Sequence, residues 1–459
     1  MFAISTKIGK VNFAVCQQCR TFDSRLKVCV NRTQNQVHLN YAEVQPKLTN
    51  EIVNSQPSTL NPQPSTMIDK PTLDFIREHA GADVRQLALQ AARYPEVDMR
   101  VAATQIEGRR LASAKLPAWA AVEGIVFPVR LSLEQCSSEV TARYKAELVR
   151  GTHLADLTGG FGIDCSYMSE SFEKATYIER NEELCRIASH NFALLQKPVQ
   201  VINANSEEAL ASLPHQDWIF IDPARRDKAG NKVVSLSDCE PDVCQLESLL
   251  LQKATHVMVK CSPMLDISQA IRELRSVIEV HVVSVNNECK ELLLILGEEG
   301  SEDIPIRTVN FHGDAVQEFA YSAAAESGAS CHYASSMGRY LYEPNSSLMK
   351  AGCYRLPAQR FGLSKLHPNT HLYTSDTLVS DFPGRVFQVE CVCGFSKKEL
   401  KALDCKKANL AVRNFPERVD ALQKRLKISD GGSIYLFATT LYDESKVLVV
   451  CTKVSENHK

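Results

Sequence analysis

The sequence predicts an α/β protein whose central domain is a parallel sheet, with a helical domain before it and a smaller α+β domain after it. Three observations predict this fold class. Short runs of β-forming residues alternate with helical segments over residues 151–297, a helical period dominates residues 67–150, and a glycine-rich turn follows the first predicted strand. In such a sheet, ligands bind beyond the carboxyl ends of the strands, where the strand order reverses.

The composition is that of a globular protein, with 44% hydrophobic and 23% charged residues. Because 52 bases stand against 54 acids, the whole molecule has no field that would collect nucleic acid, and any basic surface must be local. The 16 cysteines are dispersed, and the isolated pair Cys16-x-x-Cys19 is too weak a signal for a zinc site, so we predict no metal. Neither a secretory segment nor a membrane-spanning run is visible, which favours a cytoplasmic protein without a membrane partner.

Residues 1–66 differ from the rest of the chain. They are rich in Asn, Gln, Ser, Thr and Pro and end in the near-repeat N-S-Q-P-S-T, N-P-Q-P-S-T. This composition predicts an unfolded segment, or one that is not part of the natural protein. Met67 is followed by Asp69 and Pro71, which are typical of a helix start, so we expect folding to begin there.

Residues 67–150 are expected to form a helical N-terminal domain. The apolar residues Val84, Leu87, Ala88 and Ala91 recur at a helical spacing, and Asp83 stands where an N-cap is expected. This pattern predicts one helix with a stripe that faces a core.

Seven strands are expected in the central domain, residues 151–300: His153 to Leu157, Ala175 to Glu179, Val199 to Ile202, Trp218 to Ile221, His256 to Lys260, Val280 to Val285 and Leu292 to Leu296. Residues 301–384 are expected to form a connecting region or a small ferredoxin-like domain. Residues 385–459 show a compact α+β pattern.

A glycine-rich turn ends the first predicted strand, in the order Asp156-Leu157-Thr158-Gly159-Gly160-Phe161-Gly162. Glycine permits a tight turn and close approach of a ligand, since a Cβ would obstruct both. Glu179 ends the second strand, where a carboxylate can accept both hydroxyls of a ribose. Together these residues predict a cofactor that contains adenosine.

Two kinds of cofactor fit this pattern. A nicotinamide or flavin dinucleotide requires G-x-G-x-x-G, but Cys165 occupies the place of the third glycine. An acid directly before the glycines repels a pyrophosphate, whereas it suits the positive charges of S-adenosylmethionine. We therefore predict S-adenosylmethionine.

The chain resembles the class I S-adenosylmethionine-dependent methyltransferases, in particular a bacterial family with a helical N-terminal region and a C-terminal THUMP-like domain. The resemblance covers about residues 67–457 and rests on five ordered blocks: Leu133 to Glu139, Asp156 to Asp164, Asp222 to Arg226, Tyr342 to Asn345 and Arg413 to Pro416. It implies a Rossmann-like seven-stranded methyltransferase sheet and an α+β THUMP-like domain over residues 385–459.

The resemblance also assigns residues to the cofactor. It places the methionine part on Asp156, Gly160 and Gly162, and the ribose on Glu179. Asn205 stands where such enzymes often carry an Asp for the adenine amino group, and Thr158 replaces the first glycine of the usual loop. The expected cofactor-binding set is Asp156, Thr158, Gly159, Gly160, Gly162, Glu179, Asn205 and Asp222.

The fourth predicted strand leads into Asp222-Pro223-Ala224-Arg225-Arg226. Asp222 is expected to position the substrate or take a proton, and the two arginines to bind phosphate. A structural cluster of salt bridges is the alternative. The block is not the N-P-P-[YF] motif of enzymes that methylate exocyclic nitrogen of adenine, so that chemistry loses support.

Cys261 ends the fifth predicted strand, next to Ser262-Pro263. It is either the nucleophile of a pyrimidine carbon methyltransferase or a buried, inert thiol. The base rate for buried cysteine favours the second interpretation, and with it methylation of an amino nitrogen or a hydroxyl assisted by Asp222.

The stretch from Arg385 to Lys427 holds eleven bases against five acids, a local excess that suits nucleic acid. Phe415 is either a stacking platform or a core anchor. THUMP domains bind RNA, so the resemblance points the same way. We expect an S-adenosylmethionine-dependent methyltransferase that acts on structured RNA. The alternatives are a methyltransferase acting on a protein or small molecule, and an RNA-binding protein with a relic cofactor site.

Overall fold

The computed structural model describes residues 58–59, 67–225, 235–298, 303–396, 399, 403 and 405–454. The expectations for Cys16 and Cys19 fall outside these residues, as does the role expected for Arg226 and for the side chain of Arg225.

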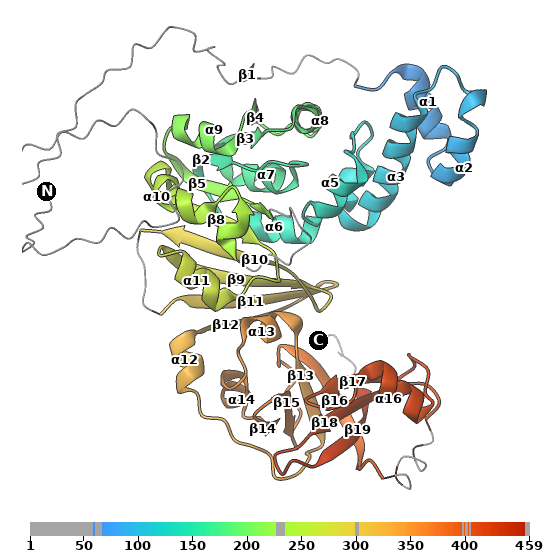
Figure 1. The fold of residues 1–459 in the computed structure, drawn as a ribbon, viewed down its shortest axis with the longest axis vertical. Helices are drawn as coiled ribbons and strands as arrows, with labels where there is room; N and C mark the ends of the chain where they lie inside the picture. Colours follow the sequence, from blue (N-terminus) through green and yellow to red (C-terminus); the bar gives the residue numbers. More distant parts are fainter. Residues whose placement is uncertain are drawn as a thin grey trace, which may run out of the picture. The chain divides into compact units, whose positions relative to one another are not determined.

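The N-terminal region is helical (Figure 1). Its elements are α1 (Lys70–Glu78), α2 (Val84–Leu89), η1 (Ala91–Arg93), α3 (Met99–Lys115), α4 (Pro117–Ala121), α5 (Arg130–Gln135) and α6 (Glu139–Leu148). The Asp69 side chain caps α1 by accepting the Thr72 N–H at 2.8 Å, and Asp83 caps α2 in the same way. The stripe expected from Val84 to Ala91 is interrupted, because α2 ends at Leu89 and only Leu87 of the four apolar residues is buried.

The central sheet has ten strands within the described residues, in the order β1-β4-β3-β2-β5-β8-β10-β9-β11-β12. Their bounds are β1 (Ser58–Thr59), β2 (Gly151–Asp156), β3 (Phe172–Glu179), β4 (Val199–Asn203), β5 (Gln216–Ile221), β8 (Ala254–Cys261), β9 (Val277–Val285), β10 (Glu288–Gly297), β11 (Pro305–His312) and β12 (Ala315–Ser322). Strands β4, β3, β2, β5 and β8 are parallel, and β10 lies antiparallel between β8 and β9.

All seven predicted strands are present, so the predicted fold class is confirmed. Strands β11 and β12 continue the same sheet up to Ser322, whereas the sequence pattern ends the central domain at residue 300. The strand order reverses between β2 and β5, because β3 and β4 extend the sheet on one side of β2 and β5 and β8 extend it on the other. A ligand site is expected at the carboxyl ends of these two strands.

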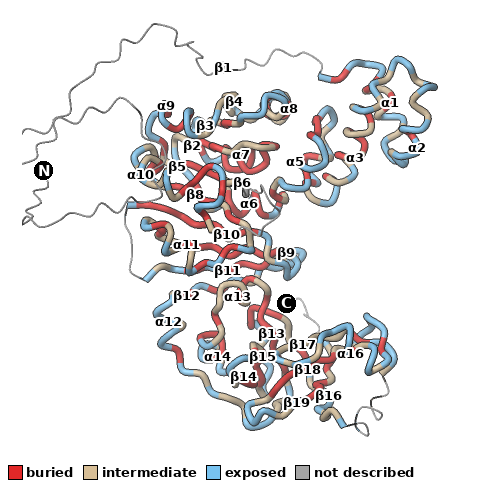
Figure 2. The backbone as a smooth tube through the Cα atoms, in the orientation of Figure 1, coloured by how far each residue is buried: buried red, intermediate tan, exposed pale blue. Residues whose placement is uncertain are grey.

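Helices cover both faces of this sheet. They are α7 (Ile163–Met168), α8 (Glu182–Leu194), α9 (Ser206–Ser212), α10 (Val243–Lys253) and α11 (Ile267–Glu273), with the short η2 (Ser169–Ser171) and η3 (Leu236–Asp238) and the two-stranded β6 (Ala224–Arg225) and β7 (Cys239–Glu240). Adjacent residues of one strand enter different clusters, as Val257 packs with α10 and α11 while Met258 packs with α6. Figure 2 shows the resulting buried strands. Burial on both faces explains why the strands are continuous apolar runs.

A second sheet of seven described strands forms the C-terminal part, in the order β14-β15-β13-β16-β19-β18-β17. Its elements are β13 (Tyr340–Pro344), β14 (Ser364–His367), β15 (Thr370–Ser375), β16 (Gly384–Cys393), β17 (Asn409–Arg413), β18 (Ile434–Thr440) and β19 (Lys446–Lys453), with α12 (Ala323–Gly328), α13 (Ser346–Ala351), α14 (Leu356–Phe361) and α16 (Val419–Leu426).

Two of the sequence blocks that carry the family resemblance meet in this sheet. The carboxylate of Glu343 is 4% exposed and forms ion pairs with Arg385 and with Arg413, the latter at 2.6 Å. The three residues lie on β13, β16 and β17. The blocks around Glu343 and Arg413 therefore hold the C-terminal sheet together, and these two arginines are engaged within the fold.

Candidate active site

A cavity of about 720 Å³ opens at the carboxyl ends of β2, β5 and β8, where the strand order reverses. The turn after β2 forms one wall, and the ends of β3 and β4 form another. The segment that joins α5 to α6 closes the cavity from the helical region. Asp156, Glu179, Asn205, Asp222 and Cys261 all line it, so the structure brings these expected site residues together.

Glycine is needed at the positions of the turn after β2 for different physical reasons. A Cβ on Gly159 would lie 2.1 Å from the Tyr177 ring, so this glycine is required by packing rather than by a ligand. Gly160 and Gly162 have φ values of +55° and +84°, which favour glycine. The Tyr177 hydroxyl donates to the Gly160 carbonyl at 2.5 Å, and this hydrogen bond holds the turn in place.

Asp156 lies at the floor of the cavity, 1% exposed. One carboxylate oxygen accepts the Thr158 N–H at 3.0 Å. Burial raises the pKa of this carboxyl well above its ordinary value, and the nearby carboxylates Asp164 and Asp222 raise it further. The Thr158 N–H and the Lys260 ammonium oppose this shift, and a further cation bound beside Asp156 would stabilise its charged form.

Glu179 stands at the end of β3 with both carboxylate oxygens oriented by the backbone. Oε2 accepts the Gly160 N–H at 3.0 Å, and Oε1 accepts the Asn181 N–H at 2.8 Å. Each oxygen keeps a free lone pair for a hydroxyl. Asn205 is exposed at the cavity, but its carbonyl oxygen caps α9 by accepting the Glu207 N–H at 2.9 Å, so only one lone pair of that oxygen remains for a ligand.

Thr158, which replaces a glycine of the usual loop, joins two strand ends. Its hydroxyl accepts the backbone N–H of Asp222 at 2.7 Å and ties the turn after β2 to the end of β5. The Asp222 side chain is 38% exposed, and one of its oxygens lies 2.5 Å from Lys260 Nζ. Asp222 is therefore a carboxylate held by a lysine at the cavity wall.

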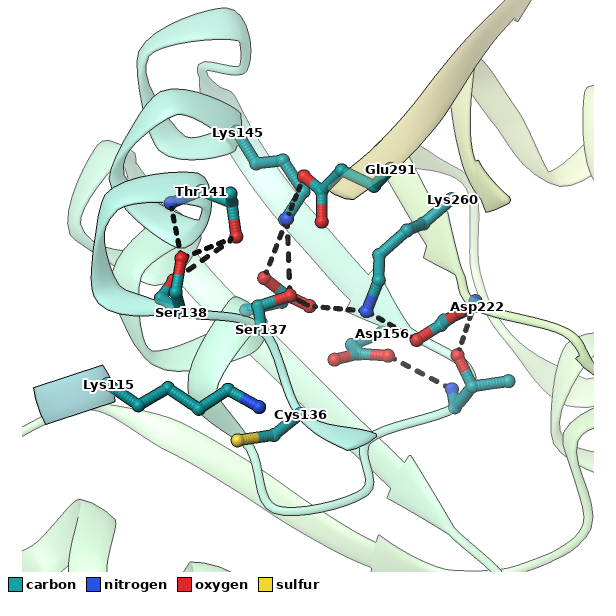
Figure 3. A network of polar contacts seen from close by, with 12 residues as sticks. Lys115, Cys136, Ser137, Ser138, Thr141, Lys145, Asp156, Asp222, Lys260 and Glu291 are labelled. Carbon is teal, nitrogen blue, oxygen red and sulfur yellow. Dashed lines mark hydrogen bonds and ion pairs between the residues drawn. The ribbon is translucent and has the colours of Figure 1, made fainter. Parts of the chain in front are cut away.

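Lys260 belongs to a chain of alternating charges that sequence reasoning missed (Figure 3). We call it the charge chain, and its members are Asp222, Lys260, Asp164, Lys145 and Glu291. Lys260 Nζ lies 3.4 Å from Asp164, and Lys145 Nζ lies 3.2 Å from Asp164 and 2.5 Å from Glu291. Ser137 donates to Asp164 at 2.7 Å.

Four members of the charge chain come from β8, α7, α6 and β10, and the fifth, Asp222, directly follows β5. The signal that reveals them is a charged residue inside an apolar run. Lys260 follows the apolar Val257 to Val259, Glu291 precedes Leu292 to Leu296, and Lys145 lies on the buried side of α6. Charged residues are almost never fully buried unless they are paired, so each of these three residues implies a partner.

Three cysteines line the cavity, Cys136, Cys239 and Cys261, and the thiols of Cys136 and Cys261 are protected. Cys261 is 6% exposed, burial raises the pKa of its thiol well above the ordinary value, and the thiol donates to the Val259 carbonyl. Cys136, beside Lys115, has its thiol pKa raised to about 11 by burial. A thiol that keeps its proton is a poor nucleophile, so the geometry favours the inert interpretation of Cys261.

The basic stretch of the C-terminal part is less available than the count of bases suggests. Arg385 and Arg413 pair with Glu343, and Arg425 pairs with Glu417. The Phe415 ring packs against Phe395, 4.7 Å between centroids, which supports the interpretation of Phe415 as a core anchor.

The described part of the chain contains no cluster of three or more residues suited to hold a metal ion. Among the same residues, no helix has the length and apolar character that crossing a membrane requires.

Comparisons with known proteins agree with this site. The family model of a ferredoxin-like domain matches residues 340–383, and that of a THUMP domain-like region matches residues 384–453. An "uncharacterized S-adenosylmethionine-dependent methyltransferase" of Mycobacterium tuberculosis is 26% identical over 301 residues, which are 65% of this chain and 80% of the relative. The crystal structure of a "putative methyltransferase" from Porphyromonas gingivalis W83 is 36% identical with a TM-score of 0.76, and the match covers 84% of this chain and 98% of that one. The chain belongs to the S-adenosylmethionine-dependent methyltransferases.

The cavity of this methyltransferase fits S-adenosylmethionine. Its volume is within the range of small-molecule sites, and the buried Asp156 favours a cation such as the ammonium of the methionine part. The two oriented oxygens of Glu179 suit a ribose, and a Cβ on Gly162 would lie 2.7 Å from the Phe192 ring and displace the turn. The predicted cofactor and the predicted enzyme class are therefore confirmed.

Proposed function

We propose that this methyltransferase acts on structured RNA, with chemistry in the cavity of the central sheet and RNA affinity in the C-terminal part. The observation that carries the proposal is the combination, in one chain, of a cofactor site with a THUMP domain-like region. THUMP domains bind RNA. An exposed group of lysines beside the C-terminal sheet also supports RNA binding by this part of the chain.

This group, which we call the basic patch, consists of Lys406, Lys407, Lys424 and Lys427. All four are exposed. Lys406 accepts the Ser429 N–H through its carbonyl at 3.0 Å, so the segments that carry Lys406 and Lys427 lie side by side. Exposed lysines are point charges that can contact phosphates without sequence preference.

The proposed roles of the site residues follow from their contacts. S-adenosylmethionine supplies a methyl group on a positively charged sulfur. Asp156 binds the ammonium of the methionine part, Glu179 binds the ribose hydroxyls, and Asn205 contributes at the adenine. The turn from Thr158 to Gly162 supports the methionine part, and Asp222 orients the acceptor and receives its proton. Arg225, on the segment that follows Asp222, is proposed to contact RNA phosphate.

The domain limits are also proposals. The proposed limits are residues 67–150 for the helical domain, 151–300 for the methyltransferase domain, 301–384 for the connecting region and 385–459 for the THUMP-like domain. The connecting region begins with β11 and β12, which extend the central sheet. Apart from the two-residue edge strand β1 (Ser58–Thr59), which pairs with β4, residues 1–66 are proposed to lie outside the catalytic unit.

Mass spectrometry of RNA from a strain that lacks the gene tests the proposed substrate class. We expect one modified nucleoside to disappear from structured RNA and to return when the intact gene is supplied, but not when it carries Asp222→Ala. An RNA modification profile identical to that of the parent strain, together with a methylated protein or small molecule that disappears, would assign the enzyme to the other substrate class.

A further inference from the structure

Lys260 is a fixed cation at the position where the acceptor must lie. Its side chain is 12% exposed, it lines the cavity, and its Nζ is 2.5 Å from Asp222 and 3.4 Å from Asp164. Burial alone would lower the pKa of Lys260, but Asp222, Asp164 and Glu291 together raise it well above the ordinary value. Lys260 therefore donates hydrogen bonds and does not accept a proton.

The charge chain explains why this cation is held so firmly. Behind Lys260, Asp164 is bound by the fully buried Lys145, which is bound in turn by Glu291. Ser137 adds a hydrogen bond to Asp164. Each buried charge has an opposite neighbour, so none can move without leaving another unpaired. Lys145 and Glu291 are positioning residues for Lys260.

Asp222 and Lys260 together present one acceptor and one donor at the same point of the cavity. A hydroxyl satisfies both, since it donates its hydrogen to Asp222 and accepts from Lys260 Nζ. An exocyclic amino group offers donors but no acceptor for Lys260. Methylation of a neutral amine also creates a positive charge beside Lys260, whereas a hydroxyl oxygen becomes more negative as its proton leaves, and the ammonium stabilises that charge.

The described residues of the cavity also provide no exposed aromatic side chain on which a nucleobase could stack. Its described aromatic lining residues are Phe161 and Phe220, 3% and 2% exposed, and the undescribed segment 226–234 contains no aromatic residue in the sequence. Enzymes that methylate a base hold it in a pocket between stacking side chains. The observations favour an acceptor on the sugar.

From the Asp222 and Lys260 pair and the lack of an exposed aromatic side chain among the described residues of the cavity, we infer that the acceptor is the 2′-hydroxyl of a ribose in RNA; this inference rests on the proposed function. The hydroxyl oxygen forms a bond to the methyl carbon. The bond from carbon to sulfur breaks, and its electron pair stays on sulfur. The hydroxyl proton passes to Asp222, which is partly exposed and releases it to water. The products are a 2′-O-methyl ribose, S-adenosylhomocysteine and one proton.

The test uses the purified full chain, S-adenosylmethionine labelled in the methyl group, and total RNA from a strain that lacks the gene. Alkaline hydrolysis requires a free 2′-hydroxyl, so ribose methylation leaves the label in alkali-stable dinucleotides, while base methylation leaves it in mononucleotides. We expect dinucleotides. Label in mononucleotides would overturn the inference and keep the RNA substrate. Unlabelled RNA would overturn the proposed function and the inference with it.

A variant series tests the role of Lys260. Lys260→Met is expected to lower kcat by about 10²- to 10³-fold, with the dissociation constant of S-adenosylmethionine in calorimetry unchanged within about threefold. Lys260→Arg, which keeps the charge and the donors, is expected to restore part of the rate. Lys253→Met is the control, because Lys253 lies just before the other end of β8, where it binds the carbonyls of Ala211 and Leu213.

The series remains decisive if Lys260→Met does not fold. The double variant Lys260→Met and Asp222→Asn removes one charge of each sign, so Asp222 is not left as an unpaired carboxylate. It is expected to fold, to bind S-adenosylmethionine and to leave RNA unlabelled. Wild-type kcat in either folded variant would contradict a catalytic role for Lys260.

Discussion

Asp156 couples cofactor binding to pH, because its carboxyl is buried without a cation in contact. Burial raises the pKa of Asp156, while an ammonium bound beside it would lower that pKa again. The protonated form therefore predominates below the raised pKa and competes with the cofactor. We expect the affinity for S-adenosylmethionine to increase as pH rises through this pKa, with release of a proton on binding. Calorimetry between about pH 5 and pH 8 in two buffers of different ionisation enthalpy measures both effects.

Glu179 contributes to cofactor affinity through its two oriented oxygens. A hydrogen bond to a charged carboxylate contributes about 1.5 to 3 kcal/mol, so Glu179→Ala is expected to weaken S-adenosylmethionine binding by roughly tenfold or more. The loss of the contact to the Gly160 N–H adds to this effect. The exposed Glu182→Ala on α8 is the matched control. Wild-type affinity in calorimetry of Glu179→Ala would contradict the assignment.

The sequence revealed the cofactor side of the site more fully than the acceptor side. Asp156 and Glu179 are the last residues of β2 and β3, and Gly160 lies in the turn after β2, so residue type and position alone indicate a role. The charge chain is different, because Lys145 and Glu291 are 146 positions apart in sequence and meet only when α6 packs beside β10. Their presence in apolar segments indicates partners, but no local pattern identifies which partners.

At the scale of elements, β9 and β11 are joined by a charge cluster that makes stability depend on pH. His281 and Arg307, with burial opposing them, lower the pKa of Glu279 to about 2. The unfolded value is about 4.3, so this stabilisation is complete above that pH and is lost as pH falls toward 2. Glu279→Gln is expected to lower Tm at pH 7, with the difference from wild type shrinking toward zero near pH 2.

Calorimetric scans over this range check the prediction. Glu288→Gln is the control, because Glu288 pairs with Lys290 at the surface and is 72% exposed. Its effect on Tm is expected to be small at every pH. A difference between Glu279→Gln and wild type that stays constant down to pH 2 would contradict the linkage.

Strands buried on both faces were the most predictable elements, since β5, β8 and the antiparallel β10 are largely apolar runs bounded by turns. Strands β11 and β12 were missed because buried and exposed residues are mixed along them, so neither forms a continuous apolar run. The helix from Val84 was predicted too long. Ala88 and Ala91 match a helical period by type, but the first is exposed and the second begins a separate 3₁₀ turn, so periodicity of small residues did not establish a buried stripe.

At the scale of the whole molecule, the C-terminal part contacts a residue that lines the cavity. Lys350 on α13 donates to the carbonyl of Leu265 at 2.7 Å, and Leu265 lines the cavity after β8. Ser346, at the start of α13, shares a hydrogen bond of 2.9 Å with Ser284 on β9. These contacts join the second sheet to the first close to the site.

The basic patch predicts that RNA binding depends on salt concentration. Each phosphate contact by a lysine releases counterions, so binding of a labelled RNA stem-loop should weaken steeply with salt. Replacing the four lysines of the basic patch by alanine is expected to reduce the slope of log affinity against log salt by about 3. Lys397, Lys398 and Lys401, bases of the same stretch, lie outside the described residues, and a second triple variant tests them separately.

Two readouts separate RNA affinity from chemistry in these variants. The patch variant is expected to raise KM for RNA while kcat and the affinity for S-adenosylmethionine stay near wild type. The reason is that the patch lies at the C-terminal end of α16 and on the segment before β17, whereas the cofactor residues lie at the strand ends of the central sheet. Replacing Arg85, Arg93 and Arg100 in the helical domain provides a control with a comparable loss of exposed charge. A slope that falls equally in the control, or does not fall in the patch variant, would contradict RNA binding by the C-terminal part.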